Sequence, residues 1–345
     1  MAFSLIENPM RPSLGFLALL VAVACWQGKE VVAPVGPPPT SGGGTGTGGG
    51  GTGGGGTGGT GTTSDTTVGM LTFTPSTTLF NENSYGVWGF DSTDVWAVGN
   101  NGRVMHYDGL AWTVLTSGTT SNLTDAWGTS SSDLFVVGAA GTILHFDGTT
   151  WTRMTSPTTR TLYSVWGFAS TDVWAVGESG TVIHYDGSEW TSVPYSRTEH
   201  LFSVWGISPN DVWVVGSEST IVRWNGTGWT VTYGPISSGP SFKGIDGLAA
   251  DRVFVVGWNG SVMYWNGASW RQMASVGDAV TLEKVEVLAV NDAYATGGGA
   301  SMYHFNGLHW TAVPNSSGRG WYGIWAASPT DIWVAGGTRM VHGAP

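Results

Sequence analysis

The chain is 345 residues long, with 55 glycines, a single cysteine and a formal net charge of −11. Acidic residues outnumber basic residues by 24 to 13 and the basic residues form no stripe, so the composition excludes nucleic-acid binding and simple attraction to anionic lipid. No zinc-ligand spacing, phosphate-binding glycine loop before a helix or G-x-S-x-G motif occurs, so we expect no metal, no cofactor and no catalytic residue.

Residues 1–24 have the pattern of a secretion signal. Arg11 precedes an apolar run at residues 14–24, which is shorter than the roughly 20 residues that a membrane-spanning helix needs. Met10 is the more usual start for such a signal, because the residues before it include Glu7 and add no positive charge.

Cys25 follows directly after Val21-Ala22-Val23-Ala24. This run resembles the lipobox of bacterial lipoproteins, although Ala22 stands where Leu is usual. The resemblance implies cleavage before Cys25, lipidation of Cys25 and membrane attachment through the lipid anchor only. Trp26 at the next position resembles a signal for outer-membrane sorting, so we expect the protein at the outer membrane or surface of a Gram-negative bacterium. The alternative is an ordinary signal peptide with an incidental cysteine.

Residues 25–67 are predicted to be a flexible tether. Between about Gly36 and Ser64 the chain is composed almost entirely of Gly, Thr, Pro and Ser, with no apolar residue to bury after Val35. About thirty such residues span on the order of 30 Å. We therefore expect the folded part, residues 68–345, to stay near a surface but to turn freely.

The folded part consists of repeats, shown most clearly by residues 162–193, which read as four short strands at 162–168, 172–177, 181–186 and 189–193. The second and third strands are apolar on both faces, so each sheet must be covered on both sides. A glycine ends the second strand of each repeat, in steps of 39, 39, 39, 41, 40 and 39 residues, at Gly99, Gly138, Gly177, Gly216, Gly257, Gly297 and Gly336.

A period of about 40 residues with four strands per repeat is typical of a β-propeller blade, and seven repeats predict an all-β, seven-bladed β-propeller. The seventh repeat ends before its last strand. Phe73 lies 39 residues before Trp112, the tryptophan of the first repeat's last strand, so residues 70–75 are predicted to supply the missing strand and close the ring.

Two polar residues recur once per repeat. The aspartates before each second strand are interpreted as structural residues that bond backbone N–H groups in a turn: Asp94, Asp133, Asp172, Asp211, Asp251, Asp292 and Asp331. One position on the third strand is interpreted as a buried, hydrogen-bonding histidine rather than a metal ligand: His106, His145, His184, His304 and His342. Residues spaced around a ring lie too far apart to share one metal ion.

Asp-Gly or Asn-Gly follows the third strand in six repeats and is predicted to form type I′ hairpin turns. The H-Y-D-G-x-x-W-T pattern around Asp108 and Asp186 resembles the Asp-box, or BNR, repeat. The L-x-x-V-W-G-x-x-x-x-D-V-W-A-V-G pattern is similar to tectonin-type lectin repeats and to propellers of the photosystem II assembly-factor type. The resemblance covers residues 70–345 and implies a fold rather than a function.

Most tryptophans are interpreted as core, with sugar-stacking platforms as the alternative. Two repeats place Asp246 and Glu286 where Trp recurs elsewhere. We expect a change of register there, because the repeat spacing is 41 and 40 residues; the alternative is that the two acids line a pocket.

Function is expected in the variable connections between repeats, which concentrate charged and aromatic residues. The candidate ligand-binding residues are Arg160, Tyr195, Arg197, His200, Tyr233, Lys243, Arg319 and Trp321. We interpret the chain as a monomeric, surface-tethered, non-catalytic binding or scaffold module that engages an envelope protein or a glycan. Alternatives are a tectonin-type lectin and a sialidase-like glycoside hydrolase, although the arginine cluster and Tyr-Glu pair that the latter requires are not visible.

Overall fold

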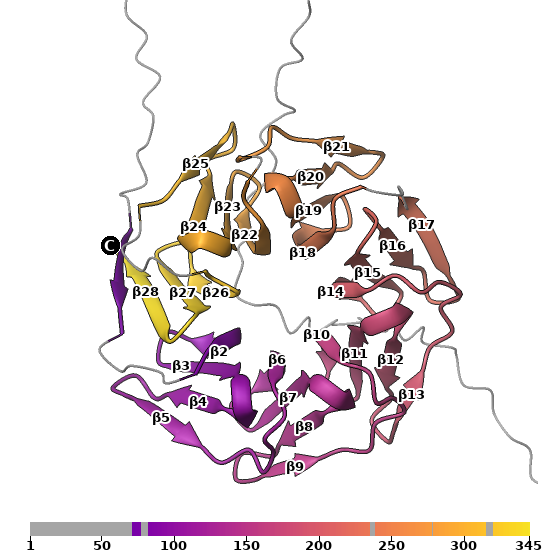
Figure 1. Cartoon of the computed structure of the whole chain (residues 1–345), viewed down its shortest axis with the longest axis vertical. Coiled ribbons are helices and arrows are strands. Elements are labelled where there is room, and N and C mark those ends of the chain that lie inside the picture. The colour runs from indigo at the N-terminus through magenta and orange to yellow at the C-terminus, as the bar shows by residue number, and fades with distance from the viewer. Residues whose placement is uncertain (1–70, 77–81, 235–238, 278, 315–319) are drawn as a thin grey trace, which may run out of the picture.

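A computed structural model describes residues 71–76, 82–234, 239–277, 279–314 and 320–345. These residues form seven four-stranded antiparallel sheets arranged as a closed ring (Figure 1), which confirms the predicted seven-bladed β-propeller. The signal sequence, Cys25, the tether and Arg319 lie outside the described residues, so the expectations about them stay predictions. Within the described ranges no helix is long and apolar enough to cross a membrane.

Each blade runs outward from the axis of the ring. Blade 1 consists of β2 Ser84–Asp91, β3 Asp94–Gly99, β4 Val104–Tyr107 and β5 Trp112–Leu115. Blade 2 consists of β6 Leu123–Ser130, β7 Asp133–Gly138, β8 Ile143–Phe146 and β9 Trp151–Arg153. Blade 3 consists of β10 Leu162–Ala169, β11 Asp172–Gly177, β12 Val182–Tyr185 and β13 Trp190–Ser192. Those of blades 4 and 5 are β14 Leu201–Ser208, β15 Asp211–Gly216, β16 Ile221–Trp224, β17 Trp229–Tyr233; β18 Phe242–Ala249, β19 Arg252–Gly257, β20 Val262–Trp265, β21 Trp270–Gln272. Those of blades 6 and 7 are β22 Leu282–Ala289, β23 Asp292–Gly297, β24 Ser301–Phe305, β25 Trp310–Ala312; β26 Gly323–Ser328, β27 Asp331–Gly336, β28 Arg339–Ala344 and β1 Thr72–Pro75.

The second strand of each blade forms the core, as its apolar pattern on both faces predicted. In β11, Val173, Ala175 and Val176 are all fully buried. Side chains on both faces of this strand pack against neighbouring blades, so no blade could exclude water from its core alone.

The ring is closed by the N-terminal strand β1, as predicted. It pairs antiparallel with β28, with Phe73 opposite Gly343, to give the sheet order β1-β28-β27-β26. A Cβ atom added to Gly343 would lie 2.4 Å from the ring of Phe73, so the phenyl group covers the backbone at this point. Closure joins the two ends of the described chain in one sheet.

The two faces of the ring differ in their connections. We call one the loop face: it carries the links between blades and the 3₁₀ turns η1 Asn100–Gly102, η2 Ala139–Gly141, η3 Glu178–Gly180, η4 Trp258–Gly260 and η5 Gly298–Ala300. The other is the hairpin face, where the first strand turns into the second and the third into the fourth. Because Thr72 pairs with Ala344 at the hairpin-face end of β28, the chain enters the ring from the hairpin face.

In six of the seven blades the recurring aspartate bonds a side chain of the third strand rather than the turn backbone, which corrects the predicted partner there. In five blades the carboxylate lies 2.7 to 2.8 Å from the third-strand histidine, as between Asp133 and His145. In blade 4, Arg223 replaces histidine and makes two hydrogen bonds to Asp211. In the strand register of blade 2, Phe135 lies opposite His145, and Asp133 lies two residues before Phe135. The hydrogen bond between aspartate and histidine therefore links the second strand to the third.

The turns between third and fourth strands are not type I′. Tyr107 pairs with Trp112, which leaves a four-residue loop in which Asp108 accepts the N–H groups of Leu110 and Ala111. Type I′ needs a positive φ at both central residues. Gly109, at φ 88°, is the one residue of this loop with a positive φ, so the aspartate side chain holds the turn instead.

Candidate functional site

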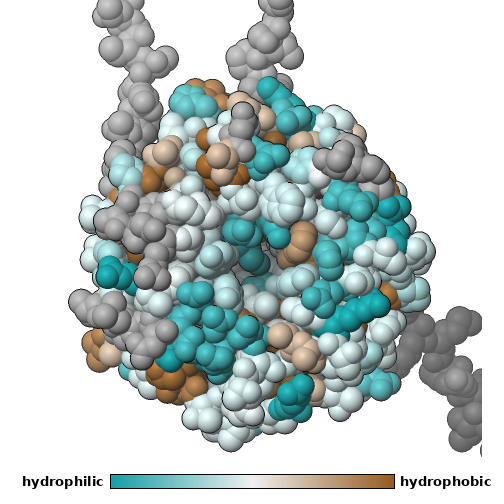
Figure 2. All heavy atoms as spheres, in the orientation of Figure 1, coloured by the Kyte–Doolittle hydropathy of each residue, from teal (hydrophilic) through white to brown (hydrophobic). Residues whose placement is uncertain are grey.

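The innermost strands of the seven blades surround a channel on the axis of the ring. Figure 2 shows it as a hollow at the centre of the viewed face, with hydrophilic residues beside it. The cavity inside has a volume of about 70 Å³. Since small-molecule sites usually measure roughly 300 to 1,000 Å³, this cavity suits a few water molecules rather than an organic ligand.

Tryptophan occupies the same position on five innermost strands: Trp88, Trp127, Trp166, Trp205 and Trp325. All of these except Trp127 line the cavity on the axis. The indole packs over a glycine of the following blade in several places. A Cβ atom on Gly167 would lie 2.5 Å from the ring of Trp127. Close approach of the ring therefore requires glycine there. Trp166 instead donates its ring N–H to the carbonyl of Gly206, at 3.1 Å.

Asp246 and Glu286 occupy the tryptophan position with no change of register, so the expected register change is wrong. Asp246 lies opposite Phe254, just as Trp166 lies opposite Trp174. The alternative, that the two acids line a pocket, is confirmed, because both line the axial cavity. Asp246 is 6% exposed and Glu286 is 7% exposed.

The reason for these two acids lies in the blade that follows each. Where other blades have glycine, blade 6 has Val287 and blade 7 has Ala326, so an indole packed over the backbone would clash with their side chains. A carboxylate is smaller, and Oδ2 of Asp246 accepts the N–H of Val287 at 2.7 Å.

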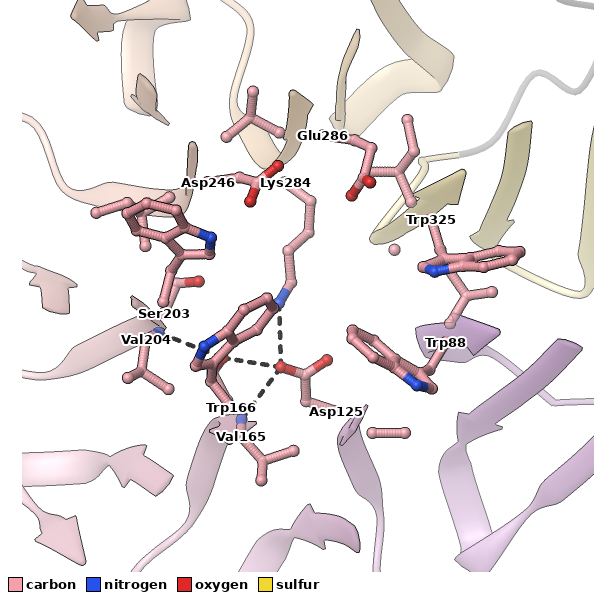
Figure 3. Close-up of a pocket in the computed structure, with 18 residues that line it drawn as sticks. Trp88, Asp125, Val165, Trp166, Ser203, Val204, Asp246, Lys284, Glu286 and Trp325 are labelled. Carbon is pink, nitrogen blue, oxygen red and sulfur yellow. Dashed lines mark hydrogen bonds and ion pairs between the residues drawn. The ribbon is translucent and has the colours of Figure 1, made fainter. Parts of the chain in front are cut away.

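A charged pair crosses the channel. Nζ of Lys284 in blade 6 lies 3.2 Å from Oδ2 of Asp125 in blade 2 (Figure 3). The same oxygen accepts the hydroxyl of Ser164 at 2.8 Å and the N–H of Val165 at 3.3 Å. The pair therefore joins blades on opposite sides of the axis and narrows the channel.

At the loop-face end of the channel, side chains from blades 3 to 5 form a group that we call the mouth patch: Tyr163, His200, Phe202, Lys243 and Trp258. Nζ of Lys243 lies 3.5 Å from the centre of the Phe202 ring and 5.8 Å from that of Trp258. The ring centres of Tyr163 and Phe202 are 5.4 Å apart. Trp258 is 47% exposed, so the patch offers one large aromatic surface to solvent.

Burial governs the charges at this mouth. It lowers the pKa of Lys243, and the nearby carboxylate of Glu283 opposes that shift. Burial also raises the pKa of Glu283, which follows Lys243 around the mouth on blade 6. Both groups therefore lack part of the hydration that their charged forms prefer, and a partner with complementary polar groups could supply it.

The candidate residues from the sequence fall into separate places. His200 and Lys243 come together in the mouth patch. Arg160 lies beside it, donating a 2.8 Å hydrogen bond to the carbonyl of Ser179, whose N–H lies 3.3 Å from Nδ1 of His200. Tyr233, at the end of blade 4, packs against Phe242, at the start of blade 5.

Tyr195 and Arg197 hold their loop together. Both donate hydrogen bonds to Oε1 of Glu199, at 2.9 and 2.6 Å. Although burial opposes it, the hydrogen bond from Arg197 helps to lower the pKa of Glu199. Trp321 is 1% exposed and lies in the core of blade 7, which corrects its placement among the surface candidates.

Sequence reasoning missed Tyr163, Phe202 and Trp258, and also the pair of Lys284 and Asp125. A usable signal existed for Tyr163 and Phe202, because each is the second residue of an innermost strand and so lies at the mouth of the channel. In the described part of the chain, no three His, Cys, Asp or Glu side chains group closely enough to hold a metal ion.

The fold and this axial site define the class as a seven-bladed β-propeller with a narrowed channel. No family model and no curated protein matches the sequence. Similar solved structures include one described as YCF48 bound to D1 peptide, with 15% identity, a TM-score of 0.65, and coverage of 80% of this chain and 97% of that one. YCF48 from Cyanidioschyzon merolae has 17% identity, a TM-score of 0.65, and coverage of 79% and 99%. A streptogramin B lyase has 13% identity, a TM-score of 0.64, and coverage of 79% and 97%. Likeness at these identities shows the fold alone.

Proposed function

We propose that the chain is a surface-tethered, non-catalytic binding module that engages an envelope protein through its loop face. The observation that carries this proposal is the mouth patch, where an exposed tryptophan, a half-buried lysine and two further aromatic rings converge beside the channel. Aromatic rings combined with a few partly dehydrated charges are typical of protein-binding hot spots.

The point at which the described chain enters the ring supports this choice of face. The described chain begins on the hairpin face, opposite the mouth patch. If Cys25 carries the lipid anchor, the chain that leads to the anchor joins the ring on the hairpin face and leaves the loop face open to other envelope components. One of the similar propellers is described as bound to a peptide, which is consistent with a protein partner.

The size of the axial cavity argues against a sialidase-like enzyme. The buried carboxylates of Asp246 and Glu286 lie where there is room for about 70 Å³ only. A sugar ring held between two carboxylates would need a larger space. We therefore assign these two acids to the packing of the ring rather than to catalysis.

The test is photo-crosslinking in the cells that make the protein, with a crosslinker at Trp258 and a second at Val231 on the outer strand β17 as control. We expect one dominant protein adduct at Trp258 and none at Val231, and loss of that partner when Phe202→Ala and Lys243→Ala are combined. Arg271→Ala, on the outer strand β21, serves as the matched charge control. Equal adducts at both positions would contradict a binding site on the loop face.

A second candidate function is glycan binding, as in the tectonin-like alternative. It is favoured by a separate hollow of about 590 Å³ on the loop face beside η1, lined in part by Asn101, Ser117 and Thr119. That volume and those amide and hydroxyl groups suit a small polar ligand. Binding to a glycan array that Asn101→Ala abolishes, and that the mouth-patch variants leave unchanged, would establish this function instead.

A further inference from the structure

Two leucines break the pattern at the tips of the hairpins between third and fourth strands. The residue after Asp-Gly or Asn-Gly is Thr149, Ser188, Thr227 or Ala268 in blades 2 to 5, but Leu110 in blade 1 and Leu308 in blade 6. Leu110 is 91% exposed and Leu308 is 75% exposed, the two highest values among the large hydrophobic residues that the structure describes.

Leucine makes fewer hydrogen bonds at this position than the hydroxyl residues of blades 2 to 4 make. In blades 2 to 4 the side-chain hydroxyl bonds the Asp or Asn of the turn, for example Oγ1 of Thr149 to Oδ1 of Asp147 at 2.7 Å. Leu110 and Leu308 keep the backbone N–H bond of the turn, at 2.9 and 3.0 Å, but cannot make the hydroxyl bond. One exposed leucine needs no explanation, but two at the same position of two hairpins, each without the hydroxyl bond, point to a contact outside the fold.

The two leucines flank the point where the tether joins the ring. Blades 6, 7 and 1 lie side by side (Figure 1), and blade 7 has no such hairpin, since β1 begins and β28 ends there. Thr72, at the start of β1, and both leucine tips lie on the hairpin face. The chain before Thr72 leads back through the glycine-rich segment to Cys25.

We propose that the hairpin face docks on a lipid surface by inserting Leu110 and Leu308, which lie on the blades to either side of the start of β1. This inference rests on the proposed function in one respect, namely that the chain is attached at Cys25. About 46 residues separate Cys25 from Leu71, which gives the tether a reach of roughly 35 to 40 Å, enough for the ring to meet the bilayer that holds its anchor. Attachment raises the effective concentration of bilayer, so two side chains suffice where they would not from solution.

A second copy of the chain fits these leucines less well than a bilayer does. Two separate tips expose far less than the roughly 800 Å² that each partner buries in a standard protein interface. Asp108, two residues before Leu110, adds negative charge at one tip. The lipid contact is therefore apolar rather than electrostatic, and it should favour zwitterionic over anionic lipid.

The test uses the chain from Cys25 onward, because its single thiol can be coupled to a maleimide phospholipid in phosphatidylcholine vesicles. Hydrogen exchange measured by mass spectrometry then compares this sample with chain whose thiol carries a small neutral maleimide. We expect exchange at residues 108–111 and 306–309 to slow at least several-fold on vesicles, and exchange at residues 147–150 and 186–189 to stay unchanged. Vesicles of phosphatidylglycerol should give weaker protection.

The matched variant is Leu110→Thr with Leu308→Thr, which installs the residue found in blades 2 and 4 together with its hydroxyl bond. It should keep the fold and lose the protection on vesicles. Equal exchange at all four hairpins would overturn the proposal. Protection already present without vesicles would overturn it too: if it grows with protein concentration, a second copy covers the leucines, and if it does not, the tether covers them. Chemical coupling supplies the anchor, so the result does not depend on lipidation in cells or on a loop-face partner.

Discussion

Lys284 and Asp125 meet across the axis of the ring, with 3.2 Å between Nζ and Oδ2, although 159 residues separate them in the chain. Their side chains are 23% and 11% exposed. Removing one partner leaves the other charge largely dehydrated. We expect Lys284→Met to lower the free energy of unfolding by about 1 to 3 kcal/mol, because Asp125 keeps its other hydrogen bonds.

Urea denaturation of Lys284→Met, Asp125→Asn and the double variant would measure the coupling between the two side chains. We expect the double variant to lose less stability than the sum of the two single variants. Additive losses would mean that the pair contributes no interaction of its own.

Removal of the closing strand should destabilise the whole ring. Deleting residues 71–75 uncovers Gly343 and the outer edge of β28, and removes the partly buried Phe73. We expect the Tm measured by calorimetry to fall by several degrees, because the loss exposes an edge strand and apolar surface. Thr72→Ala, at an exposed position of the same strand, is the control; an unchanged Tm for the deletion would show that the ring does not depend on this closure.

The pair of Asp133 and His145 should make stability depend on pH. Although burial opposes it, hydrogen bonds from His145 and Thr129 lower the pKa of Asp133 below its ordinary value of 3.8. A lowered carboxyl pKa contributes stability above the unfolded pKa, and this contribution is lost as the pH falls through the folded pKa. We expect Asp133→Asn to lower the Tm at pH 7, and the difference from wild type to shrink as the pH falls below 3.8. A difference that stays constant across this range would exclude the charge of Asp133 as its cause.

Attachment at Cys25 is tested by changing its side chain. Cys25→Ser should release the protein from the membrane fraction of the cells that make it, because the serine hydroxyl cannot take the thioether-linked lipid of a lipoprotein. Ala22→Leu, which supplies the residue usual in a lipobox, is the matched variant and should remain in the membrane fraction. Unchanged membrane retention of Cys25→Ser would refute lipidation.

The repeats predict the architecture from the sequence alone. Seven glycines lie 39 to 41 residues apart, and each of the first six is followed by a tryptophan. This pattern predicts four strands per blade and seven blades, and the place of Phe73 predicts the closing strand. These signals are local, since strand patterning and turn residues act within a few residues of one another. The same local signals placed the turns correctly but assigned the wrong turn type to Asp108, because the loop proved to be four residues long.

What only the tertiary structure decided are contacts between blades. From the sequence, Asp246 predicted a change of strand register. The structure instead shows that Val287 of the next blade, 41 residues further along the chain, leaves room for a carboxylate but not for an indole. The convergence of His200 with Lys243, the burial of Trp321 and the bridge from Lys284 to Asp125 likewise depend on which residues the closed ring brings together. Period and composition determine how each blade is built, but the curvature of the ring sets these distances, and no stretch of sequence encodes that curvature alone.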